Sequence, residues 1–403
     1  MPSQDRTSKR SQVLNESVIR EMTRLAAAHK AVNLAQGFPD FGAPENIRLH
    51  AEAAIRRGLN QYSITWGATR LRRAIAAKAA AMNGIQVDPD SEITVGCGST
   101  ECMMAALMAV VDPGDEVVVF EPFYENYGPD AVLCGATPRF VRLEPPRWDV
   151  DWHALERAFA GRPKALVLNT PHNPTGKVFA RAELERIAEL ARRHDVVVVT
   201  DEIYEHLAYD GREHVSIATL PGMRERTITI GGPSKTFSVT GWRIGYCLAD
   251  APLTAAIRKV HDFLTVCAPA PLQDAAAAAM EEAASYYPRL LAEYEVRRER
   301  LHGILNRSGI PCQKPQGAYY FLVDIGHFGF PDDVAFARFL VREVGVAVVP
   351  GSSFYHPPGG AQQVRFCFCK TPETLAAAEA RLAGLVAAAA RFMATAGGAG
   401  ASK

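Results

Sequence analysis

Five side chains that could do chemistry together each follow a predicted strand of the chain: Tyr124, Asn173, Asp201, Tyr204 and Lys235. They supply an aromatic ring, an amide, a carboxylate, a phenol and an amine. Each also has an ordinary structural explanation, because Asn and Asp favour turns and helix caps and a tyrosine can simply pack. What the group can do therefore depends on whether the fold brings its members together.

Lys235 lies in the segment GGPSKT, which partly resembles a phosphate-binding P-loop. A P-loop needs Gly directly before its lysine, so that backbone N–H groups can surround the phosphates. Ser234 occupies that position, and Pro233 removes an N–H donor. The sequence therefore argues against a nucleotide site. It leaves a solvated loop or a covalent bond to a ligand as the role of Lys235.

Strands alternate with helices over the middle of the chain, which predicts a mostly parallel sheet with helices on both faces. The predicted strands are EITVGCG, EVVVF, KALVLN, VVVVT and RTITI. STECMMAALMAVV, with Ser99 or Thr100 as N-cap, and RAELERIAELARRHD are predicted helices. In such sheets, ligands bind beyond the carboxyl ends of the strands. The five side chains, and the turn that starts at Gly98, all follow strand ends.

The ligand that suits these groups carries a phosphate, a flat ring with a nitrogen, and an aldehyde. The helix start after Gly98 suits a phosphate, and Tyr124 suits a ring. Asp201 suits a ring nitrogen, and the amine of Lys235 can form a Schiff base with an aldehyde. These are the features of pyridoxal 5'-phosphate. The sequence therefore predicts that Lys235 bonds covalently to this cofactor.

The composition disfavours several other classes of protein. Lys+Arg and Asp+Glu both number 44, so a formal net charge of zero provides no field for nucleic acid. No apolar run approaches the ~20 residues of a membrane span. Eight cysteines without a signal peptide indicate reduced thiols and a cytoplasmic location. Cys367 and Cys369 alternate in VRFCFCK instead of forming a CxxC pair, so we expect no metal site.

Long motifs of the chain resemble those of class I and II aminotransferases with the aspartate aminotransferase fold. The likeness is greatest to the branch that contains kynurenine, glutamine–phenylpyruvate and methionine aminotransferases. The motifs are NLAQGFPDF, LNTPHNPTGKVF, DEIYEHLAYDG, SKTFSVTGWRIGY and VRFCFCK, and they span nearly the whole chain. The resemblance implies an α/β fold of type I, with a mostly parallel seven-stranded sheet in a large domain plus a smaller α+β domain. Residues 46–281 would form the large cofactor-binding domain, and residues 1–45 and 282–403 the small one.

The resemblance also implies roles for the residues around the cofactor ring. Lys235 would be the Schiff-base lysine and the base that moves a proton. Asp201 would keep the ring nitrogen protonated, since an opposite charge favours the charged form. Tyr204 and Asn173 would hydrogen-bond the ring hydroxyl, and Tyr124 would stack on the ring face.

The cofactor phosphate has its own set of residues in the resemblance. Arg243 would bind it together with the N–H groups of Gly98, Ser99 and Thr100 at a helix N-terminus. Tyr62 would reach the phosphate of the partner subunit's cofactor. The resemblance therefore implies a homodimer with shared active sites.

The substrate α-carboxylate is expected to bind to Arg365, since a planar guanidinium forms two parallel hydrogen bonds with a carboxylate. Gly37 would let the backbone approach the same carboxylate. Asn169 would be a further donor beside Asn173. One position departs from the family, because Gly232 stands where a phosphate-binding serine is common.

The implied function is transamination between an L-amino acid and a 2-oxo acid, in two half-reactions through a pyridoxamine form of the cofactor. A β-eliminating C–S lyase, or other amino-acid chemistry on the same fold, remains open, because the fold does not determine the reaction. A purely binding role, as in the aminotransferase-like half of a transcription regulator, is disfavoured. Such a regulator needs a helix-turn-helix before NLAQGFPDF, and few residues precede that motif.

The side-chain pocket departs from that of the kynurenine-type branch. Ile19, Val266 and Cys267 align with positions where the branch has aromatic or histidine side chains. Each lost aromatic contact is worth about 0.5–1.5 kcal/mol beyond burial. No arginine stands at residues 266 and 267 to pair with a distal carboxylate, although Arg20 or Arg24 could reach the pocket. The sequence therefore predicts a neutral, medium-sized substrate such as methionine, glutamine or leucine, in preference to kynurenine or aspartate.

Overall fold

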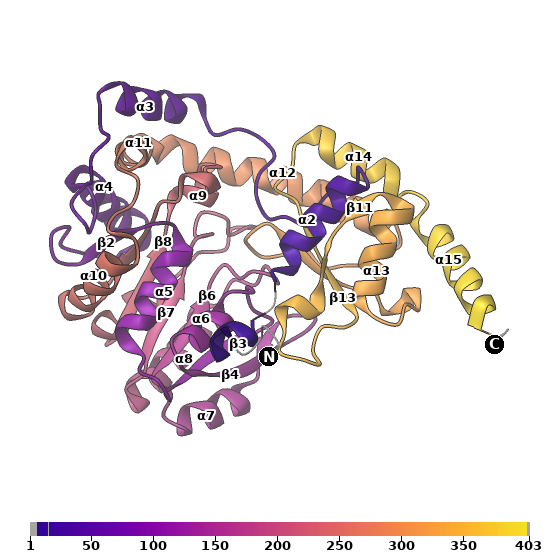
Figure 1. Ribbon diagram of the computed structural model, residues 1–403, viewed down its shortest axis with the longest axis horizontal. Coiled ribbons are helices and arrows are strands. Elements are labelled where there is room, and N and C mark those ends of the chain that lie inside the picture. Colours follow the sequence, from indigo (N-terminus) through magenta and orange to yellow (C-terminus); the bar gives the residue numbers. More distant parts are fainter. Residues whose placement is uncertain (1–5, 15, 401–403) are drawn as a thin grey trace.

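The computed structural model describes residues 6–14 and 16–400, with side chains up to residue 395 (Figure 1). Its largest sheet, called the large sheet below, has eight strands. In spatial order they are β2 (Ile93–Gly96), β9 (Gly245–Leu248), β8 (Thr227–Gly231), β7 (Val197–Asp201), β6 (Ala165–Asn169), β3 (Glu116–Glu121), β4 (Thr137–Glu144) and β5 (Asp149–Val150). β9 pairs antiparallel with β2 and β8, and β5 with β4, while the neighbours from β8 to β4 are parallel.

The predicted α/β class and the mostly parallel sheet are confirmed. The predicted strands correspond to β2, β3, β6, β7 and β8. The sheet has eight strands instead of seven, and the difference is accounted for by the two-residue strand β5 at the edge. Two residues are too few to show the alternation that identifies a strand in a sequence.

Helices cover both faces of the large sheet. One face packs against α5 (Ser99–Val110), α6 (Tyr127–Leu133) and α10 (Ala251–Thr265). The other face packs against α7 (Trp152–Ala160) and α8 (Arg181–His194). The buried strands therefore read as continuous β-branched runs, as expected for a sheet covered on both sides.

The N-cap of α5 differs from the prediction. Gly98 is the N-cap, instead of Ser99 or Thr100. Its φ of 84° lies in the left-handed region that favours glycine. Ser99 and Thr100 consequently lie within the first turn of the helix, where their N–H groups have no intrahelical acceptor.

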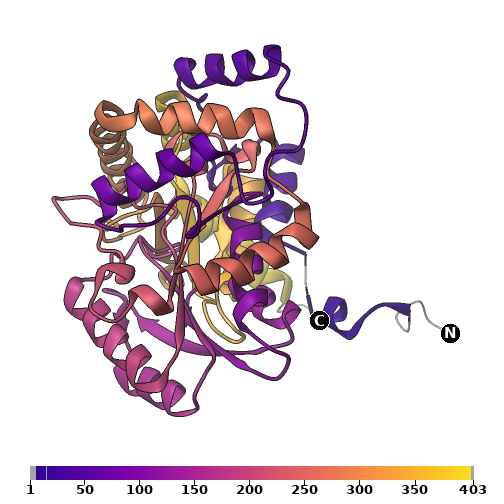
Figure 2. The ribbon, with the colours of Figure 1, turned by 90° about the vertical axis from the view of Figure 1, so that its left-hand side faces the viewer.

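Two further helices pack beside β2 and β9, and a third packs on one of these helices (Figures 1 and 2). They are α3 (Glu45–Arg56), α4 (Thr69–Lys78) and α11 (Ala270–Glu281). Leu71 and Ile75 of α4 pack with Ile93 of β2 and Ala276 of α11 in one core. Within residues 6–14 and 16–400, no helix is long and apolar enough to span a membrane.

A second, smaller sheet, called the small sheet below, has three antiparallel strands. Their order is β10 (Tyr320–Asp324), β13 (Gln363–Cys367) and β12 (Val349–Pro350). Nearby, β1 (Val32–Asn33) pairs in parallel with β11 (Val346–Ala347). The surrounding helices are α2 (Val18–Ala28), α13 (Asp333–Phe339), α14 (Pro372–Leu382) and α15 (Leu385–Gly400). Figure 1 shows α2, in indigo, beside β11, so the N-terminal segment packs with the C-terminal part of the chain.

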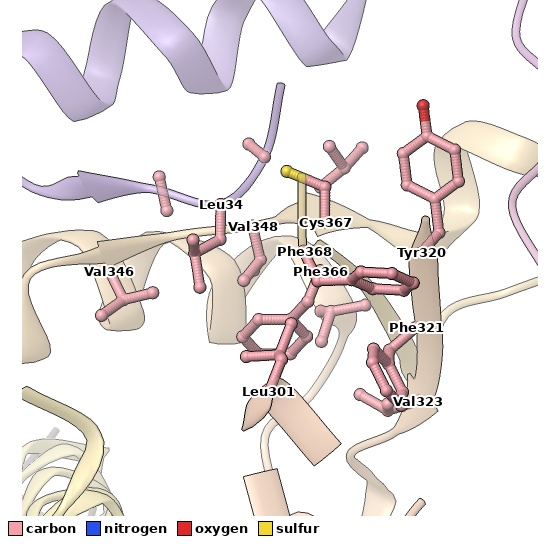
Figure 3. Packing of buried hydrophobic residues seen from close by; sticks show 14 of the residues in the cluster. Leu34, Leu301, Tyr320, Phe321, Val323, Val346, Val348, Phe366, Cys367 and Phe368 are labelled. Atoms are coloured by element: carbon pink, nitrogen blue, oxygen red, sulfur yellow. The ribbon is translucent and has the colours of Figure 1, made fainter. Parts of the chain in front are cut away.

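One hydrophobic core holds this region together (Figure 3). Leu34, Val346 and Phe366 are fully buried in it, and burying a side chain of this size contributes roughly 1.5–3 kcal/mol. In Figure 3 the hydroxyl of Tyr320 points out of the packed rings, and the sulfur of Cys367 faces the segment that carries Leu34. Both polar atoms thus leave the core on the side where the N-terminal segment passes.

The long helix α12 (Tyr286–Arg307) runs from the large-sheet side to the small-sheet side (Figure 1). Its 22 residues span about 33 Å at 1.5 Å per residue. Leu290 and Leu301 of this helix belong to the same core as Leu34. The helix therefore fixes where the small sheet stands relative to the strand ends of the large sheet.

Candidate active site

A cavity of about 300 Å³ lies beyond the carboxyl ends of β6, β7 and β8, where the two sheets approach each other. Its wall includes these predicted residues: Gly37, Ser99, Thr100, Tyr124, Asn173, Asp201, Tyr204, Lys235, Arg243 and Arg365. A larger cavity of about 890 Å³ opens beside residues 175–178, but none of the predicted side chains lies on its wall. The chemistry of the smaller cavity is therefore the one to analyse.

Asp201 ends β7 and is 7% exposed. The hydroxyl of Tyr127 donates to its Oδ2 at 2.8 Å, and the N–H of Ile203 donates to its Oδ1 at 3.1 Å. Burial raises the pKa of this carboxyl to about 6, although both hydrogen bonds and nearby Lys235 act to lower it. A cationic group in the cavity would favour the charged carboxylate. The site is thus suited to a positively charged ring nitrogen.

Lys235 reaches the cavity from the one-turn helix α9 (Pro233–Thr236), which follows β8. Its Nζ donates to the carbonyl oxygen of Gly37 at 3.1 Å. Burial lowers the pKa of Lys235 to about 8. At neutral pH a larger fraction of this amine is uncharged than in an ordinary lysine, so it is a better nucleophile and base.

The carbonyl of Gly37 also accepts a hydrogen bond from the hydroxyl of Tyr319 at 2.8 Å. A Cβ at residue 37 would overlap the hydroxyl of Tyr320, so a larger residue could not take this position without moving that ring. That hydroxyl lies 2.8 Å from the hydroxyl of Tyr204. Close packing of the N-terminal loop against these phenols is therefore the reason for a glycine at position 37.

Arg365 is 1% exposed and lies in β13, the central strand of the small sheet. Its Nη1 donates to Oδ1 of Asn173 at 2.8 Å, and its Nη2 donates to the carbonyl oxygen of Ala35 at 3.0 Å. Nε is buried without a partner, and the guanidinium lies 4.2 Å from the ring centre of Tyr320. Both acceptors are neutral, so the guanidinium still favours an anion in the cavity.

The other end of the cavity suits a phosphate. Ser99 and Thr100 line it at the first turn of α5, where free N–H groups favour an anion. A Cβ on Gly98 would overlap the guanidinium of Arg243. Nη1 of Arg243 donates to the carbonyl oxygen of Thr240 at 2.9 Å, which holds the arginine beside this helix start.

Gly232 and Ser234, the two residues whose part in phosphate binding the sequence leaves open, lie in different surroundings. A Cβ at Gly232 would lie 3.0 Å from the carbonyl oxygen of Ile244, so a serine there would require the backbone to shift. Ser234 lies on the cavity wall. The departure from the family pattern at Gly232 thus accompanies tight local packing against the strand β9 region.

Asn169 and Tyr62 do not lie on the cavity wall. Nδ2 of Asn169 donates to the carbonyl oxygen of Asp201 at 2.8 Å, and its Oδ1 accepts the N–H of Asn173 at 2.7 Å. Both ends of the Asn169 amide are therefore bonded to backbone and hold the loop in place, and its contact with the substrate stays a prediction. Tyr62 is 81% exposed on the surface of the chain.

Two tyrosines of the site were not predicted from the sequence. Tyr127 donates to Asp201, and Tyr320 contacts both Tyr204 and Arg365. The sequence signal for Tyr127 is its position three residues after Tyr124, which lies in the loop before α6, and the two ring centres lie 5.7 Å apart. That signal becomes informative only when Tyr124 is already assigned to the site.

Of the residues predicted for the side-chain pocket, some lie on the cavity wall and others lie away from it. Ile19, 8% exposed, and Arg20 lie on the cavity wall. Val266 and Cys267 do not, and Val266 is 44% exposed. Within one chain, the aliphatic side of the pocket therefore comes from the N-terminal segment.

Comparison with known proteins agrees with this geometry. Residues 29–382 match the family model described as aminotransferase class I and II. The chain is 38% identical to methionine aminotransferase of Escherichia coli (strain K12), over 92% of this chain and 96% of that protein. It is 37% identical to kynurenine–oxoglutarate transaminase 1 of Homo sapiens, over 90% of this chain and 94% of that protein. The structure of N-succinyldiaminopimelate aminotransferase from Mycobacterium tuberculosis superposes with a TM-score of 0.92 at 40% identity, covering 94% of this chain and 100% of that one.

The lowered pKa of Lys235 predicts how its amine reacts in the cofactor-free protein. Only the neutral amine attacks an aldehyde, so reductive methylation of Lys235 should rise about tenfold per pH unit and level off above a pH of about 8. Trapping with formaldehyde and cyanoborohydride, followed by mass spectrometry of the Lys235 peptide, measures this profile. Exposed lysine peptides from the same digest are the control, and their labelling should still rise at pH 10. If the labelling of Lys235 rose with pH in parallel with theirs, the lowered pKa of this amine would be contradicted.

Proposed function

Because this chain belongs to the class I and II aminotransferases and catalyses transamination between an amino acid and a 2-oxo acid, we propose that pyridoxal 5'-phosphate is its cofactor and a neutral, medium-sized L-amino acid its donor. The family consists of pyridoxal phosphate enzymes. The observation that carries the proposal is a buried carboxylate and a half-buried amine on one cavity whose wall includes a helix start suited to an anion.

The residues of the cavity fit this cofactor. Asp201 would pair with the ring nitrogen, and Lys235 would bond to the aldehyde carbon. Ser99, Thr100 and Arg243 would bind the phosphate. When bound, pyridoxal phosphate supplies an electron sink for the bonds at the substrate Cα.

Asn173 has two tasks in this proposal. Its Oδ1 accepts from Arg365, which orients the guanidinium. An amide has two N–H donors, and among the described residues no acceptor is bonded to its Nδ2. Asn173 can therefore donate to the ring hydroxyl together with Tyr204, while Tyr124 covers the ring face.

The proton transfer falls to Lys235. Its Nζ, with a pKa of about 8, is a base of suitable strength to accept the proton from the substrate Cα near neutral pH. Arg365 and the N–H of Gly37 would hold the α-carboxylate, which fixes the Cα–H bond relative to Nζ. Removing the substrate from water strengthens each of these electrostatic contacts.

We also propose a homodimer with shared active sites. Tyr62 and Phe263 are 81% and 93% exposed, and Ile64 is 49% exposed. Large apolar side chains exposed in this way support a protein–protein contact. In this arrangement Tyr62 reaches the phosphate in the partner subunit.

The proposed domain division supports the same chemistry. Residues 46–281 would form the large domain around the large sheet, and residues 1–45 and 282–403 the small domain around the small sheet. Residues 1–5, 15 and 401–403 of this division lie outside the described residues. Because Arg365 and Gly37 belong to one proposed domain and Lys235 to the other, substrate binding would draw the two together. A cytoplasmic location is part of the proposal.

Lys235→Ala tests the cofactor assignment. The variant should lose the visible absorption of lysine-bound cofactor and at least about a thousandfold in turnover, because it loses both the covalent attachment and the base. Absorption spectra of the purified proteins and a coupled assay with a 2-oxo acid acceptor measure both effects. A variant that keeps the absorption band and the turnover would contradict the role of Lys235. Wild-type release of pyruvate and ammonia without an acceptor would instead indicate a lyase.

A panel of donors tests the substrate proposal. We expect a larger kcat/KM for methionine, glutamine or leucine than for kynurenine or aspartate, since Ile19 offers an aliphatic wall without a ring to stack on. Each donor is assayed with 2-oxoglutarate and with pyruvate as acceptor. A tenfold advantage for kynurenine or aspartate would refute this view of the pocket, and in the case of aspartate would direct attention to Arg20.

A further inference from the structure

The carbonyl oxygen of Gln36 accepts three hydrogen bonds. The donors are Nζ of Lys370 at 3.2 Å, Sγ of Cys367 at 3.2 Å and the N–H of Phe38 at 2.9 Å. Lys370 also donates to the carbonyl oxygen of Phe38 at 3.0 Å. Figure 3 shows the sulfur of Cys367 on the side of the core that faces this N-terminal segment. Two side chains that follow Arg365 in the chain, those of Cys367 and Lys370, thus donate hydrogen bonds to the loop of residues 36–38.

The same peptide group carries the N–H of Gly37. In a trans peptide the C=O and N–H bonds point in opposite directions. Donors on the oxygen of Gln36 therefore turn the N–H of Gly37 away from Lys370. Gly37 lies on the cavity wall, and in the described part of the chain no acceptor takes its N–H.

The ammonium of Lys370 is a buried charge whose hydrogen-bond acceptors are neutral carbonyl oxygens. Its side chain is 3% exposed, and among the described residues no carboxylate forms an ion pair with it. The nearest candidate is Asp40, whose oxygens accept from the N–H of Thr371 at 2.7 Å and the hydroxyl of Thr374 at 2.6 Å. Burial acts to lower the pKa of Lys370, but nearby Cys367, Cys369 and Asp40 raise it overall, so this amine stays charged beside the loop.

From these contacts we propose that Lys370 is a positioning residue for the substrate α-carboxylate, acting through the Gln36–Gly37 peptide. The inference rests on the proposed function, because it needs a carboxylate substrate beside Gly37. The ammonium fixes the direction of the peptide and polarises it, which strengthens the N–H of Gly37 as a donor. Arg365 supplies the charged donors, and Lys370 adds a positive charge that never touches the substrate.

Lys370→Met tests this role, because methionine keeps the length of the side chain and removes its charge and its donors. We expect KM for the best neutral donor, methionine by our proposal, and for the 2-oxo acid to rise about tenfold each. The kcat should change less than about twofold, since the contact serves bound substrate and transition state alike. An unchanged KM for both substrates would overturn the proposal.

A donor without a carboxylate separates positioning from general damage. 3-(Methylthio)propylamine is methionine without its carboxylate, and stopped-flow absorbance follows its reaction with the holoenzyme. Lys370→Met should leave this rate within about twofold of wild type, because the amine makes no use of the N–H of Gly37. An equal loss for methionine and the amine would reduce Lys370 to a structural residue and overturn the proposal. Lys370→Arg, which restores charge and donors, should recover part of the methionine KM.

Three further variants serve as a control and as a second test. Lys177→Met removes another buried lysine, 6% exposed, whose Nζ pairs with Glu183 at 2.7 Å instead of the loop, and its KM values should match wild type. If Lys370→Met fails to fold, Cys367→Ala and Cys367→Ser probe the same carbonyl. Alanine should raise both KM values about twofold to threefold and serine should restore them, since a hydroxyl still donates. Equal KM values in alanine, serine and wild type would then overturn the proposal.

The wild-type protein distinguishes this proposal from the proposed function. A wild type that turns over no amino acid with any 2-oxo acid contradicts the proposed function. If the wild type turns over methionine, and Lys370→Met leaves the preference for methionine over 3-(methylthio)propylamine unchanged, only the role of Lys370 is contradicted.

Discussion

Positive charge buried without an acidic partner is the constraint on which the site depends. The guanidinium of Arg365 is bonded to the neutral oxygens of Asn173 and Ala35, and Lys370 is bonded to the neutral oxygens of the Gln36–Phe38 loop. Burial disfavours such charges, and an anion that enters the cavity stabilises them. This region of the cavity therefore favours an anion such as the carboxylate of the proposed substrate.

Asp201, on the wall of the same cavity, is a group of the opposite charge. Burial raises the pKa of this carboxyl group to about 6, and its charged form favours a cation instead of an anion. Lys235 lies on the wall of the same cavity and donates to the carbonyl of Gly37. In the proposed function, this separation of charge would let an amino acid bind by its carboxylate while the ring nitrogen of the cofactor pairs with Asp201. The carbonyl oxygen of Gly37 accepts hydrogen bonds from both Lys235 and Tyr319. The loop at Gly37 therefore links the lysine to the residue that precedes β10.

Sequence reasoning succeeded where function follows from a strand end. Asp201 and Lys235 could be placed together because parallel strands deliver their carboxyl ends to one edge. Tyr127 and Lys370 were missed because their roles come from contacts across packed elements, for which the sequence has no local pattern. The backbone contacts of Asn169 were missed for a related reason: its amide suits a ligand, but its two bonds to backbone depend on the register of β6 and β7. Gly98 replaced the expected caps because the close approach of Arg243 requires a residue without a side chain.

The most direct test of the buried positive charge is the kinetics of Arg365→Lys. Lysine keeps the charge but loses the planar fork that binds both a carboxylate and Asn173. We expect KM to rise at least about tenfold for every amino acid and every 2-oxo acid, because all of them share the α-carboxylate. A defect confined to one substrate would contradict this account and would place Arg365 in side-chain recognition.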